Sequence, residues 1–400
     1  MRILVISPTL PYPLDDGVKI RLYNLIKRTA LKHEVSILSL IWSKPEEQFV
    51  PKLQSFCSHV DTVLLRNRSK LGKLYALFQS LLSGQPLESK LAFEQAMQKK
   101  LVELLSTQKF DIVQIEHTFM APYLKTIRKL CDSKIIIVVH NIGFVQYKRM
   151  FKIAKKTSKK LRFFSNWLLM RKWEAKYLKN FDKIITLSSL DKEMLCSLVP
   201  QLDISIIQNA ADVDSNKILP VNPDKKNILF IGYMEYDANH DAALYFYRKI
   251  FPFITAQIPQ TRFFIVGKGP QKQILELSKD HNVVVTGHVD DIRPYYQFCD
   301  VSVVPLRAGG GTRGKILEAM SLGRPVVSTS LGCEGFDMID NKHLMVADDP
   351  VQFAEKTVRL LKDEDLYKRI TQEARKLVEE KYSWDAIADE LLDVYSNMMQ

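Results

Sequence analysis

Residues 301–320, VSVVPLRAGGGTRGKILEAM, decide the fold class of this chain. An apolar run of strand length, 301–305, precedes three consecutive glycines, Gly309, Gly310 and Gly311, and an apolar helical pattern follows them. Because glycine has no Cβ, a ligand can approach the loop closely, and the first N–H groups of the helix lack intrahelical partners. A strand, a glycine loop and a helix N-terminus in this order are typical of an anion-binding cradle in an α/β sheet.

Two basic residues stand at the predicted start of this helix, next to Thr312. Arg313 and Lys315 lie where the helix dipole is already positive and disfavours cations. A bound anion removes that conflict, so we expect the loop to hold the phosphates of a nucleotide-linked substrate. The alternative is a tight glycine turn with two solvated basic side chains, because short glycine motifs often occur without a ligand.

Strand-length apolar runs alternate with helical patterns along the whole chain. The runs are apolar throughout, which indicates parallel strands covered on both faces. A polar stretch, 220–226, separates two such arrays, and we therefore predict two doubly wound, Rossmann-like α/β domains facing a cleft. The predicted strands are 2–7, 34–40, 60–65, 111–116, 134–139 and 182–187, then 227–232, 262–267, 283–287, 300–304, 325–328 and 344–347.

The expected domain boundaries follow from this division. Residues 1–215 form the first domain and 225–380 the second. The last segment, 383–400, contains an amphipathic helix over 384–399 with Ser383 as its N-cap, and we expect it to return to the first domain. Helices are also predicted over 18–31, 91–105, 238–257, 271–279, 314–322 and 351–361.

Composition excludes several classes of protein. With 46% hydrophobic and 26% charged residues, the chain has the composition of a globular protein. Its first residues lack the pattern of a secretion signal, and no apolar run reaches the roughly 18 residues of a membrane span. The five cysteines have no metal-ligand spacing, so we expect reduced thiols, a cytoplasmic location and no bound metal.

The net charge of +12 is concentrated in residues 145–180. There, aromatic and aliphatic residues interleave with the basic ones, a composition that suits the headgroup layer of an anionic membrane. A solvated helical face is the alternative, and a nucleic-acid groove would need a similar composition. We expect membrane-surface contact and no nucleic-acid partner. The only acid is Glu174, and the basic residues are Lys148, Arg149, Lys152, Lys155, Lys156, Lys159, Lys160, Arg162, Arg171, Lys172, Lys176 and Lys179.

A second apolar stretch, LGKLYALFQSLLSGQPL at 71–87, is predicted to be a buried core helix, although it could also help to bind a membrane.

Polar and glycine residues follow the predicted strands where a doubly wound sheet binds ligands. After the first strand come Gly17 and Arg21, which could meet an anion or belong to a surface turn. In the second domain, Gly232 and Gly287 end strands in the same way and are candidates for donor contacts. Two neighbouring strands of the first domain end in polar pairs, Glu116 with His117 and His140 with Asn141.

Short motifs occur in a fixed order over nearly the whole chain. They include the Gly17 loop, Val139-His-Asn141, Ile207-Gln-Asn-Ala210, Ile265-Val-Gly-Lys-Gly-Pro270, Ile316-Leu-Glu-Ala-Met-Ser-Leu-Gly323 and Tyr382-Ser-Trp384. In this order the chain resembles the group 1 family of retaining nucleotide-sugar glycosyltransferases, which have the GT-B fold. The resemblance implies sugar transfer from a nucleotide-diphosphate sugar to a lipid-linked or polysaccharide acceptor at the cytoplasmic membrane face. It implies neither a metal nor an enzymic nucleophile.

The resemblance also assigns residues. Glu318 matches the acid that binds the donor ribose, and His140 matches a histidine near the transferred sugar. The glycine loop with Thr312 would bind the donor. Arg21, Glu116, His117 and Asn141 would lie on the acceptor side.

The chain departs from the family pattern at two places. Gly310 stands where the family has a further acid, and the segment after Gly232 lacks the usual Arg and Lys. We therefore expect Arg313 and Lys315 to hold the diphosphate. A catalytically inactive nucleotide-sugar-binding partner protein, or a nucleotide-sugar epimerase on the same fold, are the alternatives.

Overall fold

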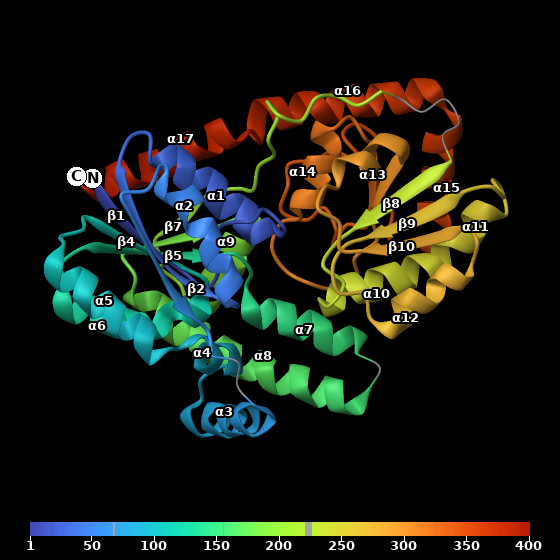
Figure 1. The fold of residues 1–400 in the computed structure, drawn as a ribbon. Helices are drawn as coiled ribbons and strands as arrows, with labels where there is room; N and C mark the ends of the chain where they lie inside the picture. Colours follow the sequence, from blue (N-terminus) through green and yellow to red (C-terminus); the bar gives the residue numbers. More distant parts are fainter. Residues whose placement is uncertain (67–68, 155, 221–225) are drawn as a thin grey trace. The chain divides into compact units, whose positions relative to one another are not determined.

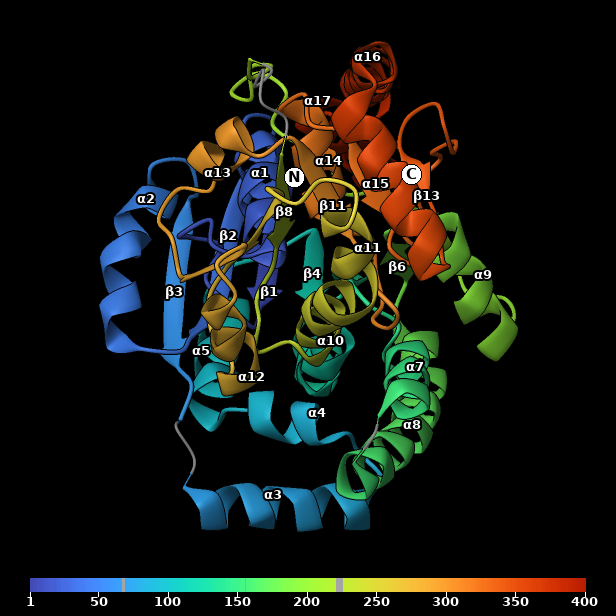
Figure 2. The same ribbon diagram turned by 90° about the vertical axis from the view of Figure 1, so that its right-hand side faces the viewer.

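The computed structural model describes residues 1–66, 69–154, 156–220 and 226–400, and these form two compact units. Unit 1 comprises Met1–Gln208 and Ile387–Gln400, and unit 2 comprises Asn209–Ala386. Each contains a parallel sheet with helices on both faces, as Figures 1 and 2 show. The two sheets confirm the predicted pair of doubly wound α/β domains. Part of the stretch expected to separate them, 221–225, lies outside the described residues.

The sheet of unit 1 has the strand order β3-β2-β1-β4-β5-β6-β7, with every described pair parallel. Its central strands are mostly apolar because helices cover both faces, so that Ile3, Leu4 and Ile6 of β1 are fully buried. The strands are β1 (Arg2–Ser7), β2 (Glu34–Ile41), β3 (His59–Leu64), β4 (Ile112–Glu116), β5 (Lys134–Val139), β6 (Lys183–Thr186) and β7 (Ile204–Ile206).

Nine α-helices of the described chain precede unit 2. They are α1 (Gly17–Thr29), α2 (Val50–Gln54), α3 (Lys70–Ser83), α4 (Leu87–Ala92), α5 (Gln95–Thr107), α6 (Leu124–Leu130), α7 (Gly143–Ile153), α8 (Thr157–Tyr177) and α9 (Ser189–Leu198). Short 3₁₀ turns cover Lys44–Phe49, Thr118–Tyr123 and Leu178–Asn180.

The sheet of unit 2 has the order β10-β9-β8-β11-β12-β13, again parallel in every described pair. Its strands are β8 (Asn227–Ile231), β9 (Arg262–Val266), β10 (Val283–Gly287), β11 (Val301–Val304), β12 (Val326–Ser328) and β13 (Met345–Val346). Its helices are α10 (Asp237–Tyr245), α11 (Phe251–Thr255), α12 (Lys272–Leu275), α13 (Arg293–Phe298), α14 (Gly314–Ser321), α15 (Pro350–Lys362) and α16 (Glu364–Lys381).

The single helix predicted over 238–257 is interrupted. A π-helical turn, Phe246–Ile250, separates α10 from α11, and Pro252 lies at the start of α11. Proline has no N–H and is tolerated only in the first turn of a helix, so a new helix begins there. The predicted helix over 271–279 likewise divides into α12 and a 3₁₀ turn, Glu276–Lys279.

The buried core helix predicted within 71–87 is wrong. Helix α3 covers most of the stretch and is followed by Gly84 in the left-handed conformation (φ 64°). Large apolar side chains on this helix are exposed, among them Leu71 at 78% and Leu82 at 73%.

The last helix, α17 (Trp384–Met398), begins in unit 2 and belongs to unit 1 from Ile387 onward. Ser383 accepts a hydrogen bond from the backbone N–H of Ala386 (3.3 Å), which confirms it as the N-cap. Within unit 1 the buried Tyr395 hydroxyl donates to Oε1 of Gln114 on β4 (2.6 Å).

Candidate active site

Each sheet has a switch point, where strand order reverses and the chain connections leave in opposite directions. It lies between β1 and β4 in unit 1 and between β8 and β11 in unit 2. Ligands of open α/β sheets bind outside the carboxyl ends of the strands at such points. We refer to the predicted residues near each switch point, after β1, β4 and β5 in unit 1 and after β8, β10 and β11 in unit 2, as the candidate half-site of that unit.

The glycine loop follows β11 at the switch point of unit 2. Gly309 (φ 114°) and Gly311 (φ 69°) both have backbone conformations that favour glycine. A Cβ at Gly309 would lie 3.1 Å from the hydroxyl of Tyr236. The loop leads into α14, whose N-cap position, Arg313, provides no capping side chain. The loop and the helix N-terminus thus have the local geometry expected of an anion cradle.

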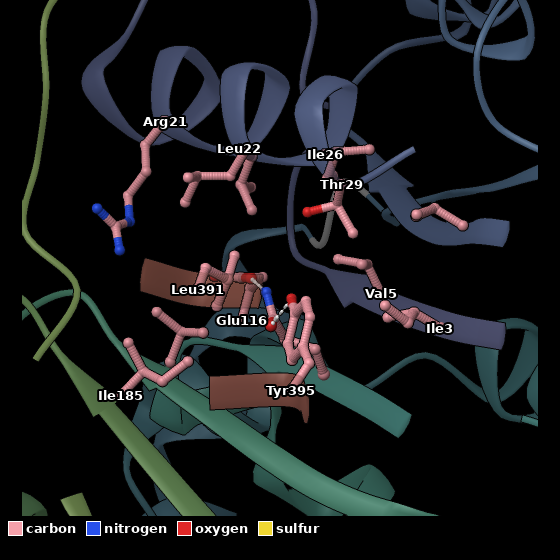
Figure 3. Close-up of a pocket in the computed structure, with 14 residues that line it drawn as sticks. Ile3, Val5, Arg21, Leu22, Ile26, Thr29, Glu116, Ile185, Leu391 and Tyr395 are labelled. Atoms are coloured by element: carbon pink, nitrogen blue, oxygen red, sulfur yellow. Dashed lines mark hydrogen bonds between the residues drawn. The ribbon is translucent and has the colours of Figure 1, made fainter. Parts of the chain in front are cut away.

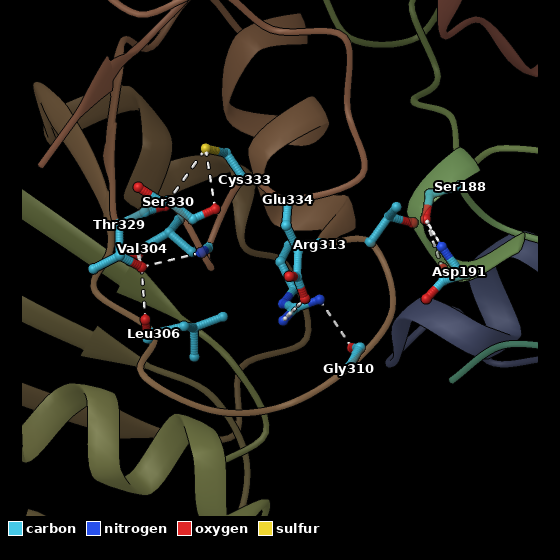
Figure 4. Close-up of polar contacts among 12 residues, drawn as sticks. Ser188, Asp191, Val304, Leu306, Gly310, Arg313, Thr329, Ser330, Cys333 and Glu334 are labelled. Carbon is cyan, nitrogen blue, oxygen red and sulfur yellow. Dashed lines mark hydrogen bonds and ion pairs between the residues drawn. The ribbon is translucent and has the colours of Figure 1, made fainter. Parts of the chain in front are cut away.

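Arg313 is buried and turned back onto this loop. Its Nη1 donates to the carbonyl of Gly310 (2.9 Å), and its Nη2 lies 3.6 Å from Oε1 of Glu334 (Figure 4). The guanidinium therefore fixes the shape of the loop. Its expected contact with donor phosphates stays a prediction. Glu334 was not predicted as a site residue from the sequence, because no local motif marks it after β12.

The start of the loop is held to the segment that follows β12. The Thr329 hydroxyl donates to the carbonyl of Leu306 (2.6 Å), as part of the polar contacts in Figure 4. Further along, Thr312 Oγ1 accepts from Nδ2 of Asn209 (2.9 Å). These contacts anchor both ends of the loop within unit 2.

Lys315 lies in the first turn of α14 and reaches the end of β8. Its Nζ donates to Oδ1 of Asn239 (3.1 Å) and lies 4.6 Å from the ring centroid of Phe230. A Cβ at Gly232 would lie 3.0 Å from this Nζ, so glycine lets the ammonium approach the strand end. Burial, and then the charge of Arg313, lower the pKa of Lys315 to about 7. A bound anion would favour its charged form.

Glu318 lies one turn further along α14. Burial raises its pKa to about 7, which the hydrogen bond from Tyr296 and the charge of Lys315 oppose. The Tyr296 hydroxyl lies 3.5 Å from Oε2. The carboxylate is half-buried and can accept from two hydroxyl groups. This arrangement suits the predicted ribose contact, which stays a prediction.

Gly287 ends β10 with φ 72°, and a Cβ there would meet no atom within 4 Å. The backbone at this strand end is therefore open to a ligand, as the expected donor contact requires.

The half-site of unit 1 is a buried pair, Glu116 and His140. Nε2 of His140 lies 2.6 Å from Oε2 of Glu116, whose Oε1 accepts from Nε2 of Gln114 (2.6 Å). Burial raises the pKa of Glu116 to about 7 and lowers that of His140 to about 3. Both shifts favour the neutral forms, so the pair can hold a proton without a net charge.

His117 follows Glu116 and is half-buried. Its φ of 69° is uncommon for a non-glycine residue, and such conformations concentrate at functional sites. Its ring stacks on that of His140, with the centroids 4.2 Å apart, and on Phe119 at 4.9 Å. The structure therefore brings together three of the predicted residues, with Asn141 next in the chain.

Arg21 occupies a different place from the one expected of an anion ligand. Only 2% exposed, its guanidinium donates to the backbone carbonyls of Ile207 (2.7 Å) and Gln208 (2.5 Å). Burial lowers its pKa to about 10. Arg21 thus ties α1 to the segment after β7, and acceptor contact stays a prediction. Gly17, the first residue of α1, is preceded by Asp16, which accepts from the N–H groups of Val18 and Lys19.

Arg21 also borders a small cavity of about 10 Å³, drawn in Figure 3. Its lining includes Glu116, Gln114, Thr29 and Tyr395. The Thr29 hydroxyl is buried and lacks a hydrogen-bond partner. A space of this size can hold at most one water molecule and is too small for a sugar.

The described residues contain neither a group of metal-ligating side chains nor a membrane-spanning helix. No three His, Cys, Asp or Glu side chains gather there as metal ligands would. None of the described helices combines the length and the apolar composition of a bilayer-spanning segment. The five cysteines are free thiols. The absence of a metal requirement stays a prediction.

Sequence comparisons find one relative over nearly the whole chain and a named glycosyltransferase over about a third of it. A protein from the cps region of Klebsiella pneumoniae, itself uncharacterized, is 24% identical over 397 residues, 95% of this chain and 96% of that one. The capsular polysaccharide biosynthesis glycosyltransferase CapM of Staphylococcus aureus is 31% identical over 133 residues, 32% of this chain and 34% of CapM.

Solved structures show the same fold. Sucrose-phosphate synthase from Thermosynechococcus elongatus superposes with a TM-score of 0.73 at 18% identity, covering 100% of this chain and 99% of that one. Anabaena HepE, solved with UDP and glucose, gives a TM-score of 0.68 at 14% identity, covering 99% and 100%. The two-sheet architecture is therefore the GT-B fold.

Two family profiles match the chain in succession. Residues 16–215 match Glycosyltransferase Family 4, and residues 225–363 match Glycosyl transferases group 1. The first match covers half of the chain and the second covers most of unit 2. The chain belongs to the group 1 glycosyl transferases, with a family 4 N-terminal domain, and is a glycosyltransferase.

Proposed function

We propose that this glycosyltransferase moves a sugar from a nucleotide-diphosphate sugar to a lipid-linked or polysaccharide acceptor, with retention of anomeric configuration. The observation that carries the proposal is the half-site of unit 2. There the glycine loop, the start of α14, Lys315 and Glu318 converge beside the end of β8. Cationic, N–H and carboxylate groups in this order match a diphosphate followed by a ribose.

Charge development on the leaving group explains the role of the cradle. As the bond from the anomeric carbon to the phosphate oxygen breaks, negative charge grows on the nucleoside diphosphate. Loop N–H groups and the Lys315 ammonium, fixed before the reaction, would stabilise that charge. The leaving phosphate oxygen would accept the acceptor's hydroxyl proton on the same face of the sugar. This route needs neither an enzymic nucleophile nor a metal.

The relatives support the substrate classes. HepE was solved with UDP and glucose, and CapM is named for capsular polysaccharide biosynthesis. We extend to this chain only the classes that these names share with the half-site: a nucleotide-linked sugar as donor and a glycan as acceptor.

Membrane-surface contact is the second part of the proposal. Helix α8 is buried at Phe163, Met170 and Trp173, yet it exposes Leu161 (69%) and Leu168 (41%). Its exposed basic residues include Lys160, Arg162, Arg171, Lys172 and Lys176, and the exposed Lys179 lies in the 3₁₀ turn that follows the helix, whereas Lys155 lies outside the described residues. Exposed apolar and cationic side chains on one helix favour the cytoplasmic face of an anionic membrane over an ordinary solvated surface.

One observation favours a second candidate, a nucleotide-sugar-binding partner protein without activity. Gly310 takes the place of the family's further acid, and its carbonyl is engaged by Arg313. Such a protein would bind donors as tightly as an enzyme but would release no nucleoside diphosphate. An epimerase, by contrast, would convert the donor without any acceptor.

A thermal-shift screen of nucleoside diphosphates and their sugar conjugates tests the donor site. A ligand that binds only the native state adds about 2.7 kcal/mol at roughly 100-fold excess over its Kd. We expect one nucleotide to stabilise the wild type and the Glu276→Ala control, but to act much more weakly on Glu318→Ala. A shift that Glu318→Ala leaves unchanged would refute the ribose assignment. Release of nucleoside diphosphate in the presence of a glycan acceptor then separates the enzyme from an inactive partner.

A further inference from the structure

Helix α3 carries an apolar stripe that unit 1 does not cover. Leu71, Tyr75, Phe78 and Leu82 are 78%, 61%, 58% and 73% exposed. Their spacing of four, three and four residues places them on one face of the helix, along its whole length. Contiguous apolar patches of this kind mark binding surfaces in soluble proteins.

The helix has defined ends and is attached to unit 1 by its opposite side. Ser69 caps its start by accepting from the N–H of Gly72 (3.2 Å), and Gly84 ends it. Ala76 and Ser80, four residues apart, are fully buried, and the Ser80 hydroxyl bonds to the carbonyl of Gln85. Because the buried side already packs against the protein, the exposed stripe is left for a partner.

A second stripe lies on α8. Leu161, Phe164 and Leu168 are 69%, 38% and 41% exposed and recur at spacings of three and four residues. In Figures 1 and 2, α3 lies outside α4, farther from the sheet, and at the same end of unit 1 as α8. Two helices thus expose apolar side chains at one end of one unit.

The basic charge of the segments that contain α3 and α8 indicates which kind of partner the exposed stripes fit. Residues 66–87 contain four basic residues, Arg66, Arg68, Lys70 and Lys73, and no acid, while 145–180 carry the twelve Lys and Arg and the single Glu174. A second copy of the chain would bring like charges together at such a face, which is unfavourable. An anionic lipid surface accepts both the cations and the apolar stripe.

We propose that α3 inserts its Leu71–Leu82 stripe into the interfacial layer of an anionic membrane, with the basic α8 beside it. This inference rests on the membrane contact proposed above and assigns its apolar anchor. The sugar-transfer half-sites are elsewhere in the fold, at the carboxyl ends of β4, β5, β8 and β11. Activity on a soluble acceptor should therefore not depend on α3.

Co-sedimentation with vesicles tests the inference. The α3 variant replaces Leu71, Tyr75, Phe78 and Leu82 by Gln, which keeps helix propensity, and circular dichroism verifies its folding. The control is the double variant Leu31→Gln/Leu130→Gln. Both leucines are exposed, and they lie away from α3, just before β2 and β5 at the amino edge of the sheet. A charge variant carries Arg171, Lys172 and Lys179 as Gln. The probes are phosphatidylglycerol–phosphatidylcholine vesicles and phosphatidylcholine vesicles.

We expect the wild type and the control to bind anionic vesicles, more weakly as salt rises, and the α3 variant to bind at least about 100-fold more weakly. Wild-type binding that the α3 variant retains and the charge variant loses would refute the α3 anchor but keep the proposed membrane contact. No wild-type binding at low salt would overturn both. Self-association of the wild type that the α3 variant abolishes, without vesicle binding, would assign the stripe to a second copy and overturn the inference.

Discussion

The affinity for a nucleotide sugar is expected to peak near pH 7. Burial lowers the pKa of Lys315 from 10.5 to about 7 and raises that of Glu318 from 4.5 to about 7. In the proposed site, phosphate oxygens contact the ammonium form of the lysine, and ribose hydroxyls donate to the ionised glutamate. Above pH 7 the free protein loses the ammonium, and below pH 7 it gains the carboxyl proton. Binding therefore weakens in both directions.

The size of the alkaline effect follows from the displacement of the lysine pKa. Burial displaces the pKa of Lys315 from 10.5 to about 7. If bound donor phosphates raise this pKa again by at least half of the displacement, the affinity falls about tenfold per pH unit above pH 7. Because half of the lysine is already deprotonated at about pH 7, the loss between about pH 7 and about pH 9 is up to about 50-fold, or about 2.3 kcal/mol. The acidic effect is smaller, about tenfold at most, because neutral hydroxyls discriminate less between the two forms of a carboxyl group.

Calorimetry in two buffers of different ionisation enthalpy measures both the affinity and the protons taken up. A nucleotide sugar serves as ligand, because its diester phosphates do not titrate in this range. Lys315→Met should lose the alkaline decline, Glu318→Gln the acidic one, and the exposed control Lys272→Met neither. An alkaline decline that persists in Lys315→Met would refute the assignment of this lysine to the diphosphate.

The same substitution should stabilise the free protein. The folded-state pKa of Lys315 is lowered, so between about pH 7 and 10.5 the unfolded chain binds more protons and stability rises with pH. Lys315→Met removes this slope, and below pH 7 it should be more stable than the wild type by roughly 1–4 kcal/mol in urea unfolding.

Two further expectations concern the supporting backbone. Gly267→Ala should lower the free energy of unfolding in urea by more than about 3 kcal/mol, because its Cβ would lie 2.0 Å from the Gly232 carbonyl oxygen. The Cβ of Gly287→Ala would meet open space, so this variant should lose only about 1 kcal/mol. Equal losses would contradict this packing. Glu174→Ala should cost about 2–4 kcal/mol, since the buried carboxyl accepts from the N–H groups of Gly143 (2.8 Å) and Phe144 (3.1 Å) at the start of α7. Burial raises the pKa of Glu174 to about 7, so this group makes wild-type stability fall from about pH 4.5 to about pH 7, and the decline should be absent in Glu174→Gln.

Most strands could be predicted from the sequence because parallel strands covered on both faces are continuously apolar. The predicted bounds of β1, β5 and β10 are those observed. Strand β7 (Ile204–Ile206) was missed, since three residues form no recognisable run. Helix α16 was also missed, because its many charged residues hide the buried face at Ile370, Ala374 and Val378.

The candidate site was predictable only where its signals are local. Three glycines, a following Lys315 and a Glu318 one turn later are adjacent in the sequence and can be interpreted together. Asn239, the hydrogen-bond partner of that lysine, lies 76 residues away and is brought close by the β8–β11 pairing. For Arg21, local sequence was misleading. A basic residue after the first strand suggested an anion ligand, but its guanidinium instead contacts two backbone carbonyls 186 and 187 residues away.

The division of the chain at Gln208 and Ile387 has an evolutionary consequence. Unit 2 is a single insertion, Asn209–Ala386, within the sequence of unit 1, and the proposed donor half-site lies wholly inside it. One recombination event that exchanges this segment would therefore replace donor selectivity while leaving the histidine–glutamate pair of unit 1 unchanged. The upstream junction falls just after the carbonyls that Arg21 binds, and the downstream junction falls inside α17. A viable chimaera must therefore preserve the hydrogen bonds of Arg21 to the carbonyls of residues 207 and 208 and the continuity of α17, as well as a compatible linker.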